Sequence, residues 1–165
     1  MRARAGFWVL DKGKLTKESK NCILSPMDDG EITVQIVENA DKEQIINLYK
    51  EAGWWNENVD NENPDLINKI IQGSFCFAVA VVNNKIVGMG RAISDGVSDS
   101  YIQDIIVLRK FRGKGIGALI MDEIIKFLKS KNIGWIALVS ESEAVAFYEK
   151  YGFSRMSGHV PYTLK

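Results

Sequence analysis

A short segment at positions 109–117 alternates basic residues with glycines and stands directly before an amphipathic stretch. It reads RKFRGKGIG, which supplies four basic side chains and three glycines. Glycine lets the backbone approach an anion closely. The first N–H groups of a helix have no partner within the helix and carry partial positive charge. The segment therefore predicts a site for a pyrophosphate or another diphosphate.

Two common phosphate-binding motifs do not account for this segment. The P-loop pattern G-x-x-x-x-G-K-[ST] is absent, and GKGIGA does not fit the dinucleotide pattern G-x-G-x-x-G. Taken alone, the segment is also compatible with a glycine-rich turn that holds no ligand.

A second segment, AVAFYEKYGF at positions 144–153, strengthens the first. Together the two resemble the signature of the GCN5-related N-acetyltransferase (GNAT) superfamily. RGKGIG at 112–117 matches the family pattern [Q/R]-x-x-G-x-[G/A], and DIIV at 104–107 matches the strand that precedes it. AVAFYEKYGF is similar to the family helix A-x-x-F/L-Y-x-x-x-G-F. The resemblance covers about residues 31–165.

This resemblance implies a mixed α/β fold, with a central sheet of about six or seven strands and about four helices. It implies transfer of an acetyl group from acetyl-CoA, as cosubstrate, directly to a primary amine, without a metal. Main-chain groups of Ile106 and Val107 would contact the pantetheine arm. The coenzyme A pyrophosphate would be held by the backbone amides of Arg112, Gly113, Lys114, Gly115, Ile116 and Gly117.

Tyr148 is the general acid that the resemblance implies, placed to protonate the leaving thiolate. A tyrosine hydroxyl is a suitable hydrogen-bond donor to developing negative charge. The alternative is an aromatic side chain that only packs in the core.

The general base is less directly indicated. A glutamate occupies the place of Gln103 in the polyamine-acetylating branch that this strand resembles, and glutamine cannot take a proton. Asp104 is the neighbouring candidate, but side chains alternate along a strand, so it faces the other way unless a bulge redirects it. A structural hydrogen-bonding role for Asp104, a water relay to another carboxylate, and an amine that arrives deprotonated all stay open.

The acceptor site is expected where the family admits its amine, beside Trp54, Trp55 and Glu57. Indole rings next to carboxylates suit a cationic amine. Asp60, Asp95, Asp99, His159 and Tyr162 belong to the same expected region, although His159 is interpreted as a tail residue. The alternative is that one tryptophan packs on the core and the carboxylates are solvated.

The elements that position these residues follow from periodicity and turn residues. A strand is expected at 32–36, a helix from Asp41 to about Gly53, and a short helix at 64–71. A hairpin turns at Asn83-Asn84 between strands at 75–82 and 85–93. A strand at 101–108, a helix at 115–131, a buried strand at 133–139 and a helix capped by Ser140 and Glu143 follow. The tail at 153–164 is expected to supply one or two last strands. The strand ending near Leu108 should splay from the one beginning near Ile133.

Composition narrows the function classes. Lys plus Arg and Asp plus Glu are each 21, so the basic excess of most nucleic-acid binders is missing. One histidine and two distant cysteines do not form a zinc-site pattern. No segment reaches membrane-spanning length, so a cytoplasmic protein without membrane partners is expected. Residues 1–30 are expected to be a loosely ordered extension of the domain at 31–165, and a homodimer stays open.

Three function classes are compatible with these patterns. The favoured one is acetylation of a small-molecule amine, because Trp54 and Trp55 suggest a walled acceptor pocket. The second is acetylation of a protein N-terminus or lysine. The third is a non-catalytic acyl-CoA sensor, which the glycine segment together with Tyr148 disfavours.

Overall fold

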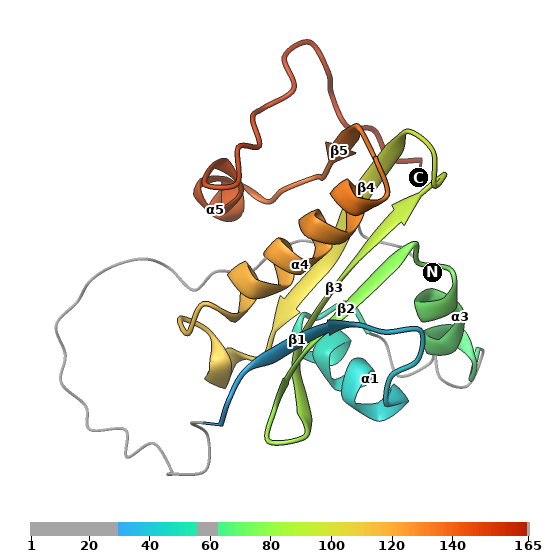
Figure 1. Cartoon of the computed structure of the whole chain (residues 1–165), viewed down its shortest axis with the longest axis vertical. Helices are drawn as coiled ribbons and strands as arrows, with labels where there is room; N and C mark the ends of the chain where they lie inside the picture. The colour runs from blue at the N-terminus through green and yellow to red at the C-terminus, as the bar shows by residue number, and fades with distance from the viewer. Residues whose placement is uncertain (1–29, 56–62, 165) are drawn as a thin grey trace, which may run out of the picture.

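A computed structural model describes residues 30–55 and 63–164 and contains a five-stranded sheet in the order β1-β2-β3-β4-β5 (Figure 1). Neighbouring strands are antiparallel except β4 and β5, which are parallel. The strands are β1 (Thr33–Ile36), β2 (Cys76–Val82), β3 (Lys85–Ser94), β4 (Asp99–Val107) and β5 (Trp135–Ala137). The α-helices are α1 (Lys42–Glu51), α3 (Leu66–Gln72), α4 (Ile116–Ser130) and α5 (Val145–Glu149), with 3-10 turns at Arg109–Phe111 and Ser142–Ala144.

Local sequence signals explain where several elements begin and turn. The side chain of Asp41 accepts a hydrogen bond from the Gln44 amide at 3.0 Å, which caps α1 as expected. Asn83 and Asn84 have φ of 48° and 60°, the left-handed conformation that a two-residue hairpin requires at both positions. The expected hairpin between β2 and β3 is therefore confirmed.

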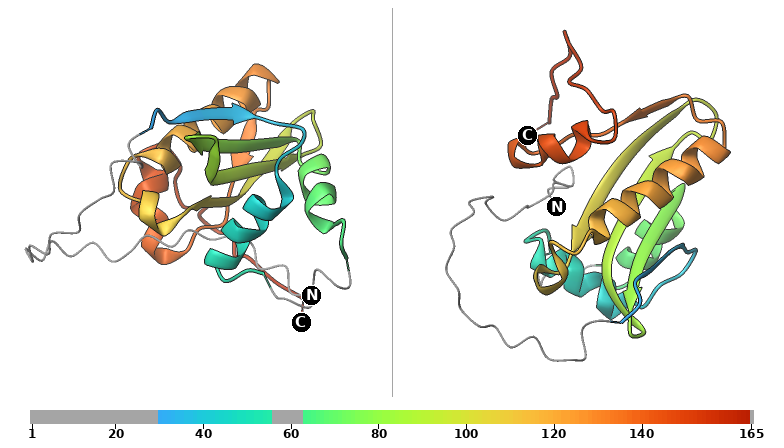
Figure 2. Two further views of the ribbon diagram at one scale, coloured as in Figure 1. Left: turned by 90° about the horizontal axis from the view of Figure 1, so that it is seen from below. Right: turned by 60° about the vertical axis from the view of Figure 1, so that its left-hand side comes forward.

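The sheet is covered on both faces. Helix α4 packs on one face and α1 with α3 on the other, as the turned views show (Figure 2). Gly90 of β3 makes the α4 contact close, because a Cβ there would lie 2.7 Å from Ile105 Cδ1 and 2.8 Å from Ile120 Cγ2. Burial on both faces explains why β2 reads as an almost continuous apolar run.

Strands β4 and β5 pair only at one end. Asp99, Ser100 and Tyr101 face Trp135, Ile136 and Ala137, and β5 then ends while β4 continues to Val107. Beyond Tyr101, no described strand pairs with this edge of β4. The expected splay between the two strands is therefore present, and α5 lies away from the sheet on the far side of the opening (Figure 1).

The end of the chain differs from expectation. The described sheet has five strands, fewer than the six or seven expected, because residues 153–164 form turns and irregular backbone and no strand. The prediction of a capping box formed by Ser140 and Glu143 is also wrong. Ser140 Oγ donates to the Glu141 carbonyl at 2.7 Å, and a 3-10 turn precedes α5.

Two further expectations concern the N-terminal extension and membrane-spanning segments. Residues 1–29 of the expected extension lie outside the described residues. Within the described ranges, no helix combines the length and apolar character needed to cross a membrane.

Candidate functional site

The glycine segment forms an open backbone cradle at the start of α4. Gly113 and Gly115 have φ of +77° and +79°, conformations that side chains rarely adopt. A Cβ added at either glycine would meet no atom within 4 Å. Gly115 is the N-cap of the 15-residue α4 and offers no side chain to cap it. The loop thus combines an N-terminus of α4 that no side chain caps with open space beside two glycines, and these features suit a bound anion.

Neighbouring side chains brace this cradle. Arg112 Nε donates to the Val107 carbonyl at 2.9 Å, which ties the cradle to the end of β4. The Arg109 amide donates to the Glu51 carboxylate, which ties it to α1. The ammonium groups of Lys110 and Lys114 lie 4.7 and 5.8 Å from the centre of the buried Phe111 ring. Positive charge thus surrounds the loop while Phe111 anchors it in the core.

The edge of β4 that β5 leaves unpaired runs from Tyr101 toward this cradle. Ile105 and Val107 pack on the α4 side of the sheet, and Ile106 packs on the α1 side. The two residues predicted to contact a pantetheine arm, Ile106 and Val107, thus lie where β4 runs without β5 beside it.

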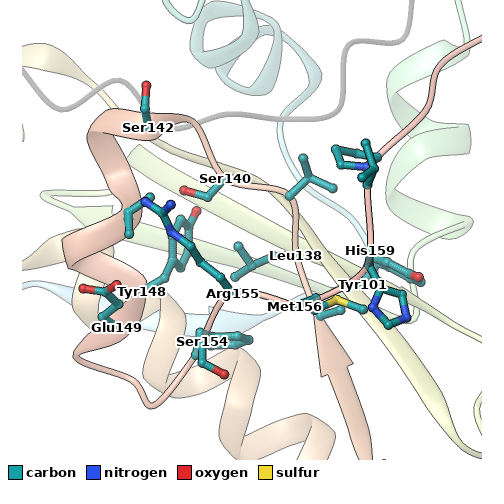
Figure 3. Close-up of a pocket in the computed structure, with 16 residues that line it drawn as sticks. Tyr101, Leu138, Ser140, Ser142, Tyr148, Glu149, Ser154, Arg155, Met156 and His159 are labelled. Atoms are coloured by element: carbon teal, nitrogen blue, oxygen red, sulfur yellow. The ribbon is translucent and has the colours of Figure 1, made fainter.

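Tyr148 lies on the opposite arm of the opening, in α5. It is 5% exposed, and its ring packs edge-on against Phe147 at 5.2 Å and Phe153 at 6.1 Å between centroids. It also lines a cavity of about 660 Å³ formed by the end of β5, α5 and residues 153–161, with Tyr101 contributed by β4. Figure 3 shows Tyr148, Ser140 and Arg155 on one side of this cavity, and Met156, His159 and Tyr101 on the other.

A hydrogen bond joins the turn after α5 to the first turn of α4, beside the cradle. The Tyr151 hydroxyl donates to the Ala118 carbonyl in α4 at 3.0 Å. Burial, with the nearby Asp122 charge as a smaller cause, raises the pKa of Tyr151. The hydroxyl therefore stays a donor at neutral pH.

The structure places Asp104 in a buried polar cluster. Asp104 Oδ2 accepts from Arg91 Nε at 2.5 Å and from the Tyr49 hydroxyl at 2.9 Å. Arg91 Nη2 also donates to Gln103 Oε1 at 2.9 Å. Gln103 and Asp104, although adjacent in sequence, thus reach the same arginine. Burial, followed by the Asp104 charge, raises the pKa of Tyr49 far above its ordinary value, so its hydroxyl remains protonated.

The expected acceptor residues are only partly brought together. Trp54 and Trp55 are half-buried, with ring centroids 6.5 and 6.0 Å from Tyr49 of α1. Neither of them lines the cavity at Tyr148. Glu57 and Asp60 lie outside the described residues.

The remaining expected acceptor residues belong to other parts of the molecule. Asp95 accepts from the amides of Val97 and Ser98 in its own turn, and these bonds lower its pKa to about 2. Asp99 begins β4. His159 is exposed and lines the cavity, with Nδ1 3.0 Å from the Ser157 carbonyl, whereas Tyr162 is 93% exposed.

Sequence reasoning missed four residues that shape this region: Tyr49, Arg91, Tyr151 and Arg155. Tyr49 and Tyr151 were assigned only to helices, and Arg91 only to a strand. Arg91 and Asp104 lie in strands expected to be largely buried, and a charged residue inside such a strand is usually paired. That rule was the available signal for the ion pair.

Comparisons with known proteins agree with the architecture. The family model described as "Acetyltransferase (GNAT) domain" matches residues 36–161. An uncharacterized N-acetyltransferase, ycf52 of Pyropia yezoensis, is 37% identical over 71 residues, which cover 43% of this chain and 41% of that protein. Histone acetyltransferase TAP1 of Glycine max is 26% identical across 91% of this chain and 78% of its own length.

A solved structure, a GNAT-family acetyltransferase from Streptococcus pneumoniae, is 26% identical with a TM-score of 0.66. The match covers 82% of this chain and all of that one. The first curated relatives are matched over less than half of their own length.

Proposed function

Because the chain belongs to the GNAT acetyltransferase family, we propose that it transfers the acetyl group of acetyl-CoA directly to the primary amine of a small molecule. The observation that carries this proposal is the open cradle at Gly113 and Gly115. Both glycines adopt positive φ, and the space where a Cβ would stand is open. The cradle lies at the end of the β4 edge that β5 leaves uncovered.

The chain's own groups divide the work of binding. The amides of residues 112–117 would hold the pyrophosphate, since helix N-termini favour anions. Main-chain groups of Ile106 and Val107 would align the pantetheine arm along β4. Acetyl-CoA supplies an acetyl group activated as a thioester, and binding along β4 would lead that end toward the α5 arm.

Tyr148 is the proposed proton donor. As the amine nitrogen bonds to the acetyl carbon and the carbon–sulfur bond breaks, negative charge collects on sulfur. The Tyr148 hydroxyl would donate its proton there, and the amine would lose its own proton to solvent or a water relay. The buried position of Tyr148 at a cavity wall supports this role, because it combines a fixed orientation with access to the cavity.

The acceptor class rests on a less direct set of residues. Trp54 and Trp55, packed beside Tyr49, supply aromatic faces of the kind that bind cationic amines. Glu57 would add the carboxylate. The rival acceptor is a protein lysine, which the similarity to histone acetyltransferase TAP1 across most of the chain favours.

Isothermal titration calorimetry with acetyl-CoA tests the cradle. Gly115→Asp would set a carboxylate where the pyrophosphate approaches, so we expect affinity to fall by at least about tenfold with the fold retained. Gly53→Asp is the matched control, because Gly53 has φ of +73° and also has open space around its Cβ position. Equal affinity in the Gly115 variant and the wild type would refute the cradle assignment.

The acceptor class is tested by detecting free thiol released from acetyl-CoA. Aryl-alkyl amines, polyamines and a lysine-containing histone-tail peptide would be compared at matched concentrations. Turnover of small amines at a kcat/KM at least about tenfold above that of the peptide supports the proposal. Preference for the peptide would assign the chain to protein acetylation, and acetyl-CoA binding without turnover of any amine would favour a sensor.

A further inference from the structure

Strand β4 carries a β-bulge at Asp104 and Ile105, beyond its last pairing with β5 at Tyr101. Met89 of β3 faces Ile106, and Arg91 faces Gln103, so Asp104 and Ile105 together oppose the single residue Gly90. Two residues against one is the definition of a bulge, which bends a strand and increases its twist. Asp104 has φ of +51° and is the one non-glycine strand residue with positive φ among the described residues.

The bulge moves the β4 side chains that follow it to the opposite faces of the sheet. Ile102 packs on the α4 side, so strict alternation would place Asp104 and Ile106 on that side as well. Instead Ile105 and Val107 take the α4 side, and Ile106 packs with α1. The β4 edge that approaches the cradle therefore has its orientation set at Asp104.

The Asp104 side chain is held from two other elements. Arg91 of β3 and Tyr49 of α1 both donate to the same carboxylate oxygen, at 2.5 and 2.9 Å. The Asp104 side chain is 9% exposed and that of Arg91 18%, so the pair is largely shielded from water. Such charge-assisted bonds are about twice as strong as neutral ones. Aspartate is also among the few residues that tolerate positive φ.

We propose that Asp104 is a positioning residue, which acts with Arg91 and Tyr49 to lock the β4 bulge and thereby aim the β4 edge and the cradle at Tyr148. This inference rests on the proposed function, because it assigns a role in acetyl-CoA binding. It also favours the structural hydrogen-bonding role for Asp104, which the sequence left open, over the role of general base. Asp104 Oδ2 already accepts from the Arg91 guanidinium and the Tyr49 phenol, so this oxygen is engaged in structural hydrogen bonds.

Two conservative variants test the lock. Asp104→Asn keeps the shape and the tolerance of positive φ but removes the charge. Tyr49→Phe keeps the buried ring and removes one donor. Asp41→Asn is the matched control, because Asp41 caps α1 at the surface and asparagine caps equally well.

Three readouts separate the possible roles: the acetyl-CoA dissociation constant, the pH dependence of kcat, and hydrogen exchange at residues 105–107. We expect the dissociation constant to rise about three- to thirty-fold in Asp104→Asn and less in Tyr49→Phe. The shape of the pH profile should be retained, exchange at 105–107 should rise without any ligand, and Asp41→Asn should match the wild type.

Each other outcome overturns the proposal. An unchanged dissociation constant with a lost limb of the pH profile would make Asp104 the base. A lower melting temperature with unchanged binding and kinetics would leave only a structural ion pair. If the wild type bound no acetyl-CoA, the proposed function would fail separately, and unchanged exchange at 105–107 would still refute the lock.

Discussion

Replacing Tyr148 by phenylalanine removes a single oxygen atom from the cavity wall. The ring is 5% exposed and keeps its edge contacts with Phe147 and Phe153. Loss of one buried hydroxyl costs stability by about 1 kcal/mol. The proposed loss of a positioned proton donor is larger, about 10- to 1,000-fold in turnover, or about 1.4 to 4 kcal/mol of barrier.

The assay is steady-state release of coenzyme A thiol at saturating acetyl-CoA, with an acceptor that the amine screen identifies. Calorimetry on the same variant should show acetyl-CoA affinity within about threefold of wild type, because the ring remains in place. Tyr151→Phe is the matched control. It makes the same chemical change in the turn that follows α5, but it removes a bond to the Ala118 carbonyl of α4.

We expect the control to lose stability and to keep kcat at saturation within about threefold of the wild type. Turnover at the wild-type rate in Tyr148→Phe would refute the reasoning and reduce Tyr148 to a packing residue. Equal losses of kcat in both variants would also refute it, since the effect would then come from the arm rather than from the hydroxyl.

Two further predictions concern the acceptor region and acid stability. Trp54→Ala and Trp55→Ala, made separately, should differ in effect: one should raise the acceptor Michaelis constant about two- to thirty-fold, and the other should lower the melting temperature. If both variants only lower the melting temperature, the acceptor binds elsewhere. The amides of Val97 and Ser98 lower the Asp95 pKa from 3.8 to about 2, so its charge stabilises the fold above about pH 4, and this contribution is lost as the pH falls toward 2. Urea unfolding should therefore show a stability difference between the wild type and Asp95→Asn that is present at neutral pH and shrinks near pH 2; a pH-independent difference would contradict the assignment.

Local signals predicted those elements that local chemistry dictates. The Asn83-Asn84 turn requires two residues that tolerate positive φ, and few sequences other than such a pair supply them. The apolar stripe expected at 115–131 became α4 at Ile116–Ser130, since its period matches a helix packed on a sheet. The positive φ of Gly113 and Gly115 likewise follows from residue type, whereas the binding of a diphosphate there stays a prediction.

Long-range contacts explain what the sequence did not reveal. Tyr49 and Asp104 are 55 positions apart, and only the folded sheet brings the phenol to the carboxylate. The bulge left one readable trace, since the spacing of Ile102, Ile105 and Val107 skips one step of a two-residue alternation. The tail at 153–164 failed as a strand prediction although Val160, Tyr162 and Leu164 stand at every second position. Gly158 and Pro161 weaken strand pairing, and these three apolar side chains are exposed.

The short seam between β4 and β5 has a mechanical consequence for the molecule. The segment from β5 through α5 pairs with the sheet over only three residue pairs. The hydrogen bond from Tyr151 to the Ala118 carbonyl is a separate attachment to α4. Apolar packing supplies the rest of the segment's attachment, since Ala144 and Tyr148 belong to the core cluster beside α4. Segments with few backbone bonds to the rest of a fold open as cooperative units at a lower free-energy cost than segments with many. A ligand that contacts both β4 and the α5 segment would add a further attachment between them. Part of its binding free energy would then appear as a higher free energy of local unfolding of α5.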